Sequence, residues 1–395
     1  MIPLSRRRGP GVFGPRGDSC CPVTGYGGRV HDASADISPL VAGARPPRAV
    51  GDAVLAAEPL RHGLGNAATA GIWRVRGPAG SAILKVARRP AGHEPARAFP
   101  TSDEPDHWNY WRREALAYQT GLAATAYADA GIAAPELLEA VARADRGIEL
   151  WVSDVAGTAG WDWPAPRLGR FAYELGVSQA RWAGRVPGLP WLSRRWLAQY
   201  LAEGPPRVTQ VADADWDHPG LAAVWPAGLR QRLRRLHADH GRLLARAAGA
   251  ERTLCHLDVW PANLIDSGGT SVLLDWSFTG DGAVGEDISN LIIDSCTDGL
   301  MDVALLPEIA ASATDGYLRG LRDGGWNGSA GAVRATIAAC GAAKYSWFAP
   351  MVAGRAARDH IGPSSYGQDN SAAAAALRVT PLVTLIADWA DTATA

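Results

Sequence analysis

One short segment constrains this chain more than any other. Residues 255–263 read CHLDVWPAN, and residues 273–276 read LLDW. Asp258 and Asn263 fall in a short loop, whereas Asp275 ends an apolar run that is typical of a strand. Phosphoryl transfer from ATP needs this set of groups: a carboxylate for the proton of the acceptor hydroxyl, and two oxygen ligands for Mg2+ on the phosphates. The segment therefore predicts a phosphoryl-transfer site.

The chain has two lysines, Lys85 and Lys344, and arginine supplies the rest of its permanent positive charge. In so arginine-rich a chain, a lysine is expected where arginine cannot replace it. Lys85 lies in residues 81–87 (SAILKVA), which predict a short strand. Its compact ammonium suits phosphate oxygens better than a planar guanidinium does. The alternative is an ordinary surface lysine on an edge strand.

Residues 106–118 (DHWNYWRREALAY) predict a helix, with Asp106 as its N-cap and with Trp108 and Trp111 on one face. Glu114 lies in the middle of this segment. A glutamate at this distance after a strand lysine is the usual partner that directs the lysine toward phosphates. The alternative is a solvated glutamate paired with a neighbouring arginine.

Two glycines, Gly63 and Gly65, precede the lysine in residues 61–77 (RHGLGNAATAGIWRVRG). With the alternating run behind them they predict a hairpin with a bare loop, where backbone amides approach phosphates. The same letters match the G-x-G-x-x-A pattern of a dinucleotide fold. That fold needs a helix directly after the glycines and an acidic residue about 20 positions later. The chain continues instead as strand, turn and strand, which disfavours it.

Taken in chain order, these motifs resemble those of the aminoglycoside phosphotransferase family, small-molecule kinases that share the protein-kinase fold. The residues that carry the resemblance are Lys85, Glu114, His256, Asp258, Asn263 and Asp275. Asp-Trp stands where protein kinases have Asp-Phe-Gly, and no Ala-Pro-Glu follows. The resemblance covers roughly residues 53–355. It implies an α+β, bilobal protein-kinase-like fold, with a small β-rich N-lobe and a larger helical C-lobe.

The resemblance also implies a role for each residue. Asp258 would be the catalytic base or a carboxylate that orients the acceptor, and Asn263 and Asp275 would hold Mg2+. A further set would bind ATP: Lys85, Glu114, Gly63, Gly65, Ser153 and Val155. Within this set, Glu114 would orient Lys85 toward the phosphates.

Residues 148–154 would form the strand that leads into the interlobe hinge. Backbone groups near Ser153 and Val155 would bind adenine there, and Gly157 would end the turn. His256 is expected to support the catalytic loop rather than carry a proton. Asp287 is expected to cap a helix and to anchor the same loop.

The chain divides into three parts. Residues 1–50 are rich in Gly, Pro and Arg without sustained periodicity, and we expect a disordered tail there. Residues 53–155 predict the N-lobe, as strand, hairpin, helix and two further strands. Residues 156–395 predict the C-lobe, with a long helix over 226–248 and a hairpin that turns at Gly268-Gly269.

Bulk properties exclude several classes of protein. The formal net charge is −1, so no affinity for nucleic acid or membranes follows from charge, and no apolar run has the length of a membrane span. The five cysteines form no C-x-x-C pair, which favours a reducing cytoplasm. Cys255 beside His256 is better explained as a buried thiol than as half of a zinc site.

The acceptor site is less defined. The acidic segment 212–218 either faces a cationic substrate or is a solvated insertion, and the second is favoured. Lys344, with Tyr345 and Trp347, either lines the acceptor pocket or forms a structural ion pair with a carboxylate. Asp388 and Asp391 are further carboxylates that could contribute. Most of the 16 tryptophans are expected in the core, with some free to stack on a ring of the acceptor.

The sequence thus predicts an ATP- and Mg2+-dependent phosphotransferase that acts on a hydroxyl of a small molecule. An aminoglycoside, another antibiotic or an amino sugar are acceptors in keeping with the resemblance. Two alternatives stay open. One is a pseudokinase that serves as a scaffold or regulator, against which the intact set of motif residues argues. The other is a kinase that phosphorylates serine or threonine of a peptide in a biosynthetic pathway.

Overall fold

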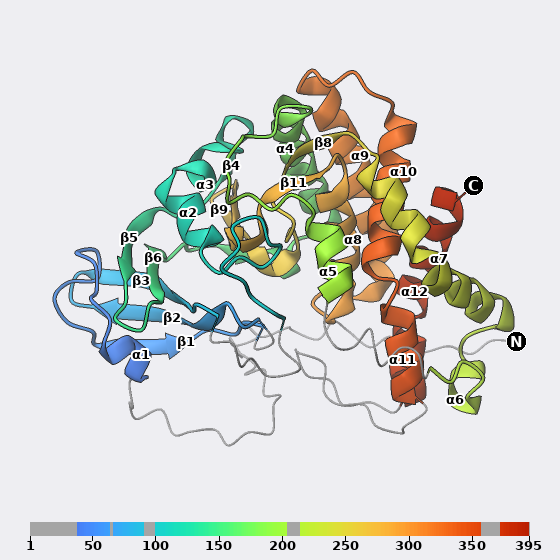
Figure 1. Ribbon diagram of the computed structural model, residues 1–395, viewed down its shortest axis with the longest axis horizontal. Coiled ribbons are helices and arrows are strands. Elements are labelled where there is room, and N and C mark those ends of the chain that lie inside the picture. The colour runs from blue at the N-terminus through green and yellow to red at the C-terminus, as the bar shows by residue number, and fades with distance from the viewer. Residues whose placement is uncertain (1–37, 64–65, 91–98, 204–213, 357–371, 395) are drawn as a thin grey trace, which may run out of the picture.

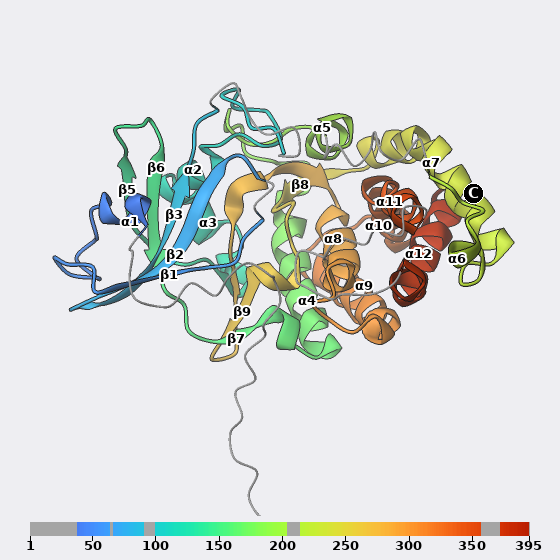
Figure 2. The ribbon, with the colours of Figure 1, turned by 90° about the horizontal axis from the view of Figure 1, so that it is seen from below.

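The computed structural model describes residues 38–63, 66–90, 99–203, 214–356 and 372–394. Its largest sheet is antiparallel, with strand order β1-β2-β3-β6-β5. The strands are β1 (Ala56–Pro59), β2 (Thr69–Gly77), β3 (Gly80–Ala87), β5 (Leu137–Ala142) and β6 (Ile148–Ser153). Figures 1 and 2 show this sheet at one end of the molecule, the long helices at the other, and β8 and β9 in between.

Alternation along β3 gives the sheet two different faces. Leu84 and Val86 point to one face, where they are buried with Trp73 and Trp151 in a small apolar cluster. Lys85 points to the other face, toward the main core, and is 8% exposed. The strand predicted over 81–87 is therefore confirmed, and Lys85 is not a surface residue.

The small cluster corrects the expectation of a disordered tail over residues 1–50. Residues 1–37 lie outside the described part of the chain. Residues 38–50, however, contain a short helix, α1 (Pro39–Ala42), and both Val41 and Val50 are fully buried against the outer face of the sheet. Burial of these two side chains stabilises a segment whose composition alone suggested disorder.

The predicted helix over 106–118 begins later than expected. Helix α2 covers Arg113–Gln119, and its N-cap is Arg112 rather than Asp106. The reason is the fully buried guanidinium of Arg113, which can only donate hydrogen bonds and needs acceptors. It donates to the backbone carbonyls of Pro105, His107 and Trp108. In a helix those carbonyls would bond to later amides instead, so residues before Arg112 remain in turns.

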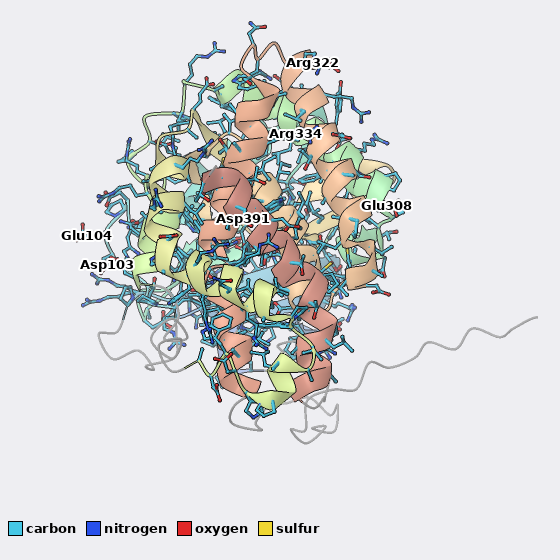
Figure 3. All side chains as sticks on the ribbon, turned by 90° about the vertical axis from the view of Figure 1, so that its right-hand side faces the viewer. Asp103, Glu104, Glu308, Arg322, Arg334 and Asp391 are labelled. Atoms are coloured by element: carbon cyan, nitrogen blue, oxygen red, sulfur yellow. The ribbon has the colours of Figure 1, made fainter. Side chains whose placement is uncertain are left out.

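The rest of the described chain is mainly helical. Its helices are α3 (Leu122–Thr125), α4 (Ala165–Trp182), α5 (Trp196–Glu203), α6 (Pro219–Ala222), α7 (Ala227–Ala248), α8 (Glu286–Thr297), α9 (Leu306–Asp323), α10 (Ala330–Lys344), α11 (Phe348–Ala356) and α12 (Ala372–Thr394). The prediction of a long helix over 226–248 is confirmed by α7. Charged side chains lie on the outside of this part, among them Glu308, Arg322, Arg334 and Asp391 (Figure 3). None of the described helices is long and apolar enough to cross a bilayer.

Helices α4 and α9 approach each other unusually closely. A Cβ atom on Gly316 would lie 2.1 Å from the carbonyl oxygen of Gly169, and one on Gly320 would lie 2.1 Å from that of Tyr173. Such distances are below any real contact, so only glycine fits at these positions. Helix α4 also contacts the strand that leads to Asp258, where the Gln179 side chain donates to the carbonyl of Leu254 over 3.2 Å.

Two small sheets position that segment. β8 (Arg252–Cys255) pairs with β11 (Gly280–Ala283), and a four-stranded sheet has the order β4-β10-β9-β7. Its strands are β4 (Ile132–Ala133), β7 (Thr158–Ala159), β9 (Leu264–Ser267) and β10 (Thr270–Leu273). The predicted turn between β9 and β10 is confirmed, because Gly268 and Gly269 have φ values of 61° and 91°. These positive angles at both central residues are those of a type I′ hairpin turn.

Candidate active site

The predicted catalytic loop runs from β8 to a 3-10 turn, Pro261–Asn263. Its two polar residues contact each other. The side-chain nitrogen of Asn263 donates to a carboxylate oxygen of Asp258 over 2.9 Å and to the backbone carbonyl of Asp258 over 2.9 Å. This double contact fixes the direction of the Asn263 amide, and Asp258 is left partly buried beside it.

Asp275 lies two residues after the end of β10 and has φ 56°, which is unusual for a residue other than glycine. Its carboxylate lies 2.9 Å from the ammonium of Lys85, which also lies 2.5 Å from the carboxylate of Glu114 on α2. Three elements that are distant in sequence therefore meet at one ammonium. Of the predicted site residues, Lys85, Glu114 and Asp275 form this first group.

The charges in this group stabilise one another. Burial alone would lower the pKa of Lys85, but the carboxylates of Asp275 and Glu114 raise it above its ordinary value. Burial would likewise raise the pKa of Asp275, but the Lys85 ammonium holds it below its ordinary value. Lys85 is therefore a permanent cation, and Asp275 is a carboxylate at neutral pH.

The backbone connects the group of Lys85, Glu114 and Asp275 to the pair of Asp258 and Asn263. The amide of Leu274 donates to the carbonyl oxygen of Asn263 over 2.9 Å, next to Asp275.

Burial and the negative charge of Asp275 raise the pKa of Asp258 to about 7, while the Lys344 ammonium acts in the opposite direction. A carboxylate with such a pKa can accept a proton near neutral pH.

His256 is fully buried, and its ring meets Trp276 edge-on with 5.1 Å between ring centres. Burial lowers the pKa of His256 to about 4, so the ring is neutral at pH 7. These observations agree with the prediction that His256 supports the loop rather than carries a proton.

Asp287 anchors the loop from helix α8. Its fully buried carboxylate accepts the backbone amides of His256 and Leu257 over 2.9 and 2.7 Å, and the side chain of Gln179 over 2.7 Å. The predicted anchor is thus observed, but the predicted helix cap is wrong. Gly285 is the N-cap of α8, with φ 103°, and the Asp287 side chain is turned toward the loop instead.

The predicted hinge follows β6. The amide of Ser153 donates to the carbonyl oxygen of Glu136 over 2.9 Å, and the Ser153 hydroxyl accepts the Glu136 amide over 2.9 Å. Between Ser153 and Val155, the carboxylate of Asp154 accepts from the guanidinium of Arg74 at 2.9 and 3.1 Å. Sequence reasoning missed Asp154, because a lone aspartate after a strand carries no motif. Adenine binding at Ser153 and Val155 stays a prediction.

The predicted phosphate loop connects β1 and β2. An added Cβ on Gly63 would meet no atom within 4 Å, so the backbone is uncovered there. The carbonyl of Gly63 accepts the amide of Asn66 over 3.0 Å. Gly65 lies outside the described residues, and the role of both glycines stays a prediction.

Lys344 forms the ion pair that was one of its two expected arrangements. It is 6% exposed, and its ammonium lies 3.1 Å from Asp294 and 3.0 Å from the Asn290 side-chain oxygen. Tyr345 donates its hydroxyl to the same Asp294 carboxylate. Asp294 and Asn290 were missed by sequence reasoning, since they lie within α8 and only tertiary packing brings them to Lys344.

The other acidic candidates for the acceptor site contact arginines. Asp217 pairs with Arg234 at 2.7 Å, and Asp388 and Asp391 pair with Arg232 at 2.5 and 2.7 Å. Residues 212 and 213 of the acidic segment lie outside the described residues. Asp217, Asp388 and Asp391 therefore belong to surface ion pairs, whereas Asp215 accepts the backbone amide of Asp217 over 3.1 Å.

Comparison with known proteins adds a decisive observation. A family model described as "Phosphotransferase enzyme family" matches residues 63–326, which contain both groups of site residues. The chain belongs to the phosphotransferase enzyme family. This confirms the predicted resemblance, and with it the prediction of a kinase whose acceptor is an alcohol group. No curated protein sequence matches the chain.

A microcompartment-associated aminopropanol kinase has a TM-score of 0.51 and 16% identity, with 87% of this chain and 93% of that chain covered. Together with the family match, this structure confirms the predicted α+β, protein-kinase-like fold. A choline/ethanolamine kinase family protein from Mesorhizobium loti is also similar, with a TM-score of 0.49, 15% identity and coverage of 90% and 96%. The boundary between the lobes, at residues 155 and 156, stays a prediction.

Proposed function

We propose that this phosphotransferase transfers the γ-phosphoryl group of ATP, bound together with Mg2+, to a hydroxyl of a small molecule. One observation carries the proposal. Lys85, distant in sequence, pairs with Asp275; the preceding residue, Leu274, donates its amide to the Asn263 carbonyl, and Asn263 contacts Asp258. The side chains of Lys85, Asp275, Asn263 and Asp258 each supply a group that in-line phosphoryl transfer requires.

The residues present fit a divalent cation. Asn263 uses its side-chain nitrogen on Asp258, which leaves its side-chain oxygen for a metal ion. Asp275 is an ionised carboxylate, and the residue before it, Leu274, donates its backbone amide to the Asn263 carbonyl. Hard cations such as Mg2+ prefer oxygen ligands of this kind. When bound, the cation would neutralise charge on the phosphates of ATP.

The chain's own residues would do the rest. Lys85, held by Glu114, would bind phosphate oxygens of ATP. Asp258 would accept the proton of the acceptor hydroxyl as its oxygen forms a bond to the γ-phosphorus and the bond to ADP breaks. The backbone near Ser153 and Val155 would bind adenine, and the loop of Gly63 and Gly65 would cover the phosphates.

A panel of acceptors tests the proposal. The protein is incubated with Mg-ATP and aminoglycosides, amino sugars, amino alcohols, other hydroxylated antibiotics or Ser/Thr peptides, and products are identified by mass spectrometry. We expect one class of small molecule to gain a phosphoryl group. The product should vanish with Asp258→Ala and persist with Asp315→Ala, which removes an exposed carboxylate on α9.

Two outcomes would contradict the proposal. Phosphorylation of peptides alone would exclude a small-molecule acceptor. Equal product from the wild-type protein and from Asp258→Ala would exclude the proposed base.

A further inference from the structure

The residue before Asp258 is held at both of its backbone polar groups. Leu257 has φ 68°, a conformation that costs a non-glycine residue about 1 kcal/mol. Its amide donates to Asp287 over 2.7 Å, and its carbonyl accepts the side-chain nitrogen of Asn290 over 3.2 Å. Both partners belong to α8. The conformation from which Asp258 projects therefore depends on contacts with this helix.

The contact with Lys344 sets the orientation of the Asn290 side-chain amide. The Lys344 ammonium donates to the side-chain oxygen of Asn290 over 3.0 Å. An amide has its acceptor and its donors at opposite ends of one planar group. With the oxygen facing Lys344, the nitrogen faces the carbonyl of Leu257. The reversed amide would place its NH2 group against the Lys344 ammonium and its oxygen against the Leu257 carbonyl oxygen. Both contacts would be repulsive.

The ammonium itself is fixed in place. It lies 3.1 Å from Asp294, and its distances to the ring centres of Tyr345, Trp196 and Tyr200 are 5.0, 5.2 and 6.0 Å. Carboxylate and aromatic faces together form a specific environment for a cation. Helix α8, which carries Asn290, and helix α10, which carries Lys344, pack side by side (Figure 1).

We propose that Lys344 is a positioning residue for catalysis: its ammonium sets the Asn290 amide, which holds the Leu257 carbonyl and so fixes the backbone of Asp258. This inference rests on the proposed role of Asp258. Besides the direct effect of its charge on Asp258, Lys344 acts on the loop backbone through Asn290, and it needs no contact with ATP or the acceptor. Each of the chain's two lysines thus uses its ammonium in a buried contact. Lys85 pairs with Asp275, and Lys344 donates to Asn290, which holds the catalytic loop.

Chemical rescue provides the test. Lys344→Ala removes three methylene groups and the ammonium, a space that propylammonium matches. Lys344→Met fills most of that space without charge, so it should show the same defect and resist rescue. Arg334→Ala removes an exposed cation from the same helix and should behave as the wild-type protein (Figure 3).

Two readouts separate this inference from the proposed function. Amide hydrogen exchange of residues 254–260 needs no acceptor, and we expect it to be about tenfold faster in Lys344→Ala and restored by propylammonium. Exchange in α4 and α9 should not change. With the acceptor identified by the panel, turnover should fall about 100-fold while the Kd for Mg-ATP changes less than about twofold.

Asn290→Ala should reproduce the exchange defect, and the double variant with Lys344→Ala should add nothing further, since both act on one contact. Wild-type exchange in Lys344→Ala and Lys344→Met would overturn the positioning role. So would a defect that propylammonium fails to reverse in Lys344→Ala. If the exchange results hold while no acceptor is phosphorylated, the proposed function fails. The contacts from Lys344 through Asn290 to Leu257 would still hold the loop.

Discussion

The ammonium nitrogen of Lys85 lies 2.9 Å from a carboxylate oxygen of Asp275. The two residues are separated by 190 positions in the chain, and the second carboxylate, from Glu114, completes the group at 2.5 Å. The strand lysine and the proposed metal ligand thus share one electrostatic environment. Any change in the shape of the cation at position 85 acts on both.

Replacement of Lys85 by arginine keeps the charge and changes the shape. The site is nearly closed, with Lys85 8% exposed, so a longer planar guanidinium cannot keep both carboxylate contacts. We expect turnover to fall about 100-fold because of misplacement, with the protein still folded. Steady-state kinetics and thermal unfolding measure the two effects.

A matched control is Arg76→Lys, which exchanges the same two residue types at an exposed ion pair with Glu58 on the same sheet. It should leave turnover unchanged. An unimpaired Lys85→Arg protein would refute the argument that lysine is kept at position 85 for its compact ammonium.

The buried ring of His256 should make the free energy of unfolding depend on pH. Its pKa is about 4 in the folded protein and about 6.5 when unfolded, because burial disfavours the charged ring. Between these values the unfolded state binds more protons, so the free energy of unfolding falls as pH falls. From pH 7 to pH 5 this residue alone accounts for a loss of about 2 kcal/mol.

Urea unfolding at pH 7 and pH 5 measures this difference. In His256→Gln, which does not titrate in this range, the loss between the two pH values should be smaller by about 2 kcal/mol. The same pH dependence in both proteins would show that folding does not change the pKa of His256.

Helix packing gives a prediction with opposite signs at two glycines. Alanine at Gly316 would place its Cβ 2.1 Å from the carbonyl oxygen of Gly169, and the backbone must move to accept it. We expect Gly316→Ala to destabilise the protein by about 3 kcal/mol. Gly241, within α7, has no atom within 4 Å of an added Cβ. Gly241→Ala should stabilise by up to about 1 kcal/mol.

Thermal or denaturant unfolding of the two variants checks this prediction. Equal effects would mean that α4 and α9 do not pack as closely as described.

Signals that depend on near neighbours in sequence predicted structure well. The alternation around Lys85, the glycine pair at 268–269 and the spacing from Asp258 to Asn263 each gave the observed element or contact. In these cases the backbone conformation follows from a few adjacent residues.

Features that depend on tertiary contacts were missed or misplaced. The start of α2 is set by the buried Arg113, which takes carbonyls from the segment before it. The capping role expected for Asp287 gave way to two amides of the catalytic loop. Asn290 and Asp294 carry no motif, and only the packing of α8 against α10 brings them to Lys344. Arg113 and Lys344 find their partners through tertiary packing and carry no motif, whereas Glu114 could be predicted as the partner of Lys85 because that pair belongs to a known motif.

The central claim is that Asp258 serves transfer and not nucleotide binding. The most direct measurement is the amount of γ-phosphoryl group that Asp258→Ala transfers when it is saturated with Mg-ATP, as confirmed by titration calorimetry. We predict a Kd for Mg-ATP within about twofold of the wild-type value and a rate of transfer lower by at least about 100-fold. Transfer at a near-wild-type rate by this variant would contradict the account.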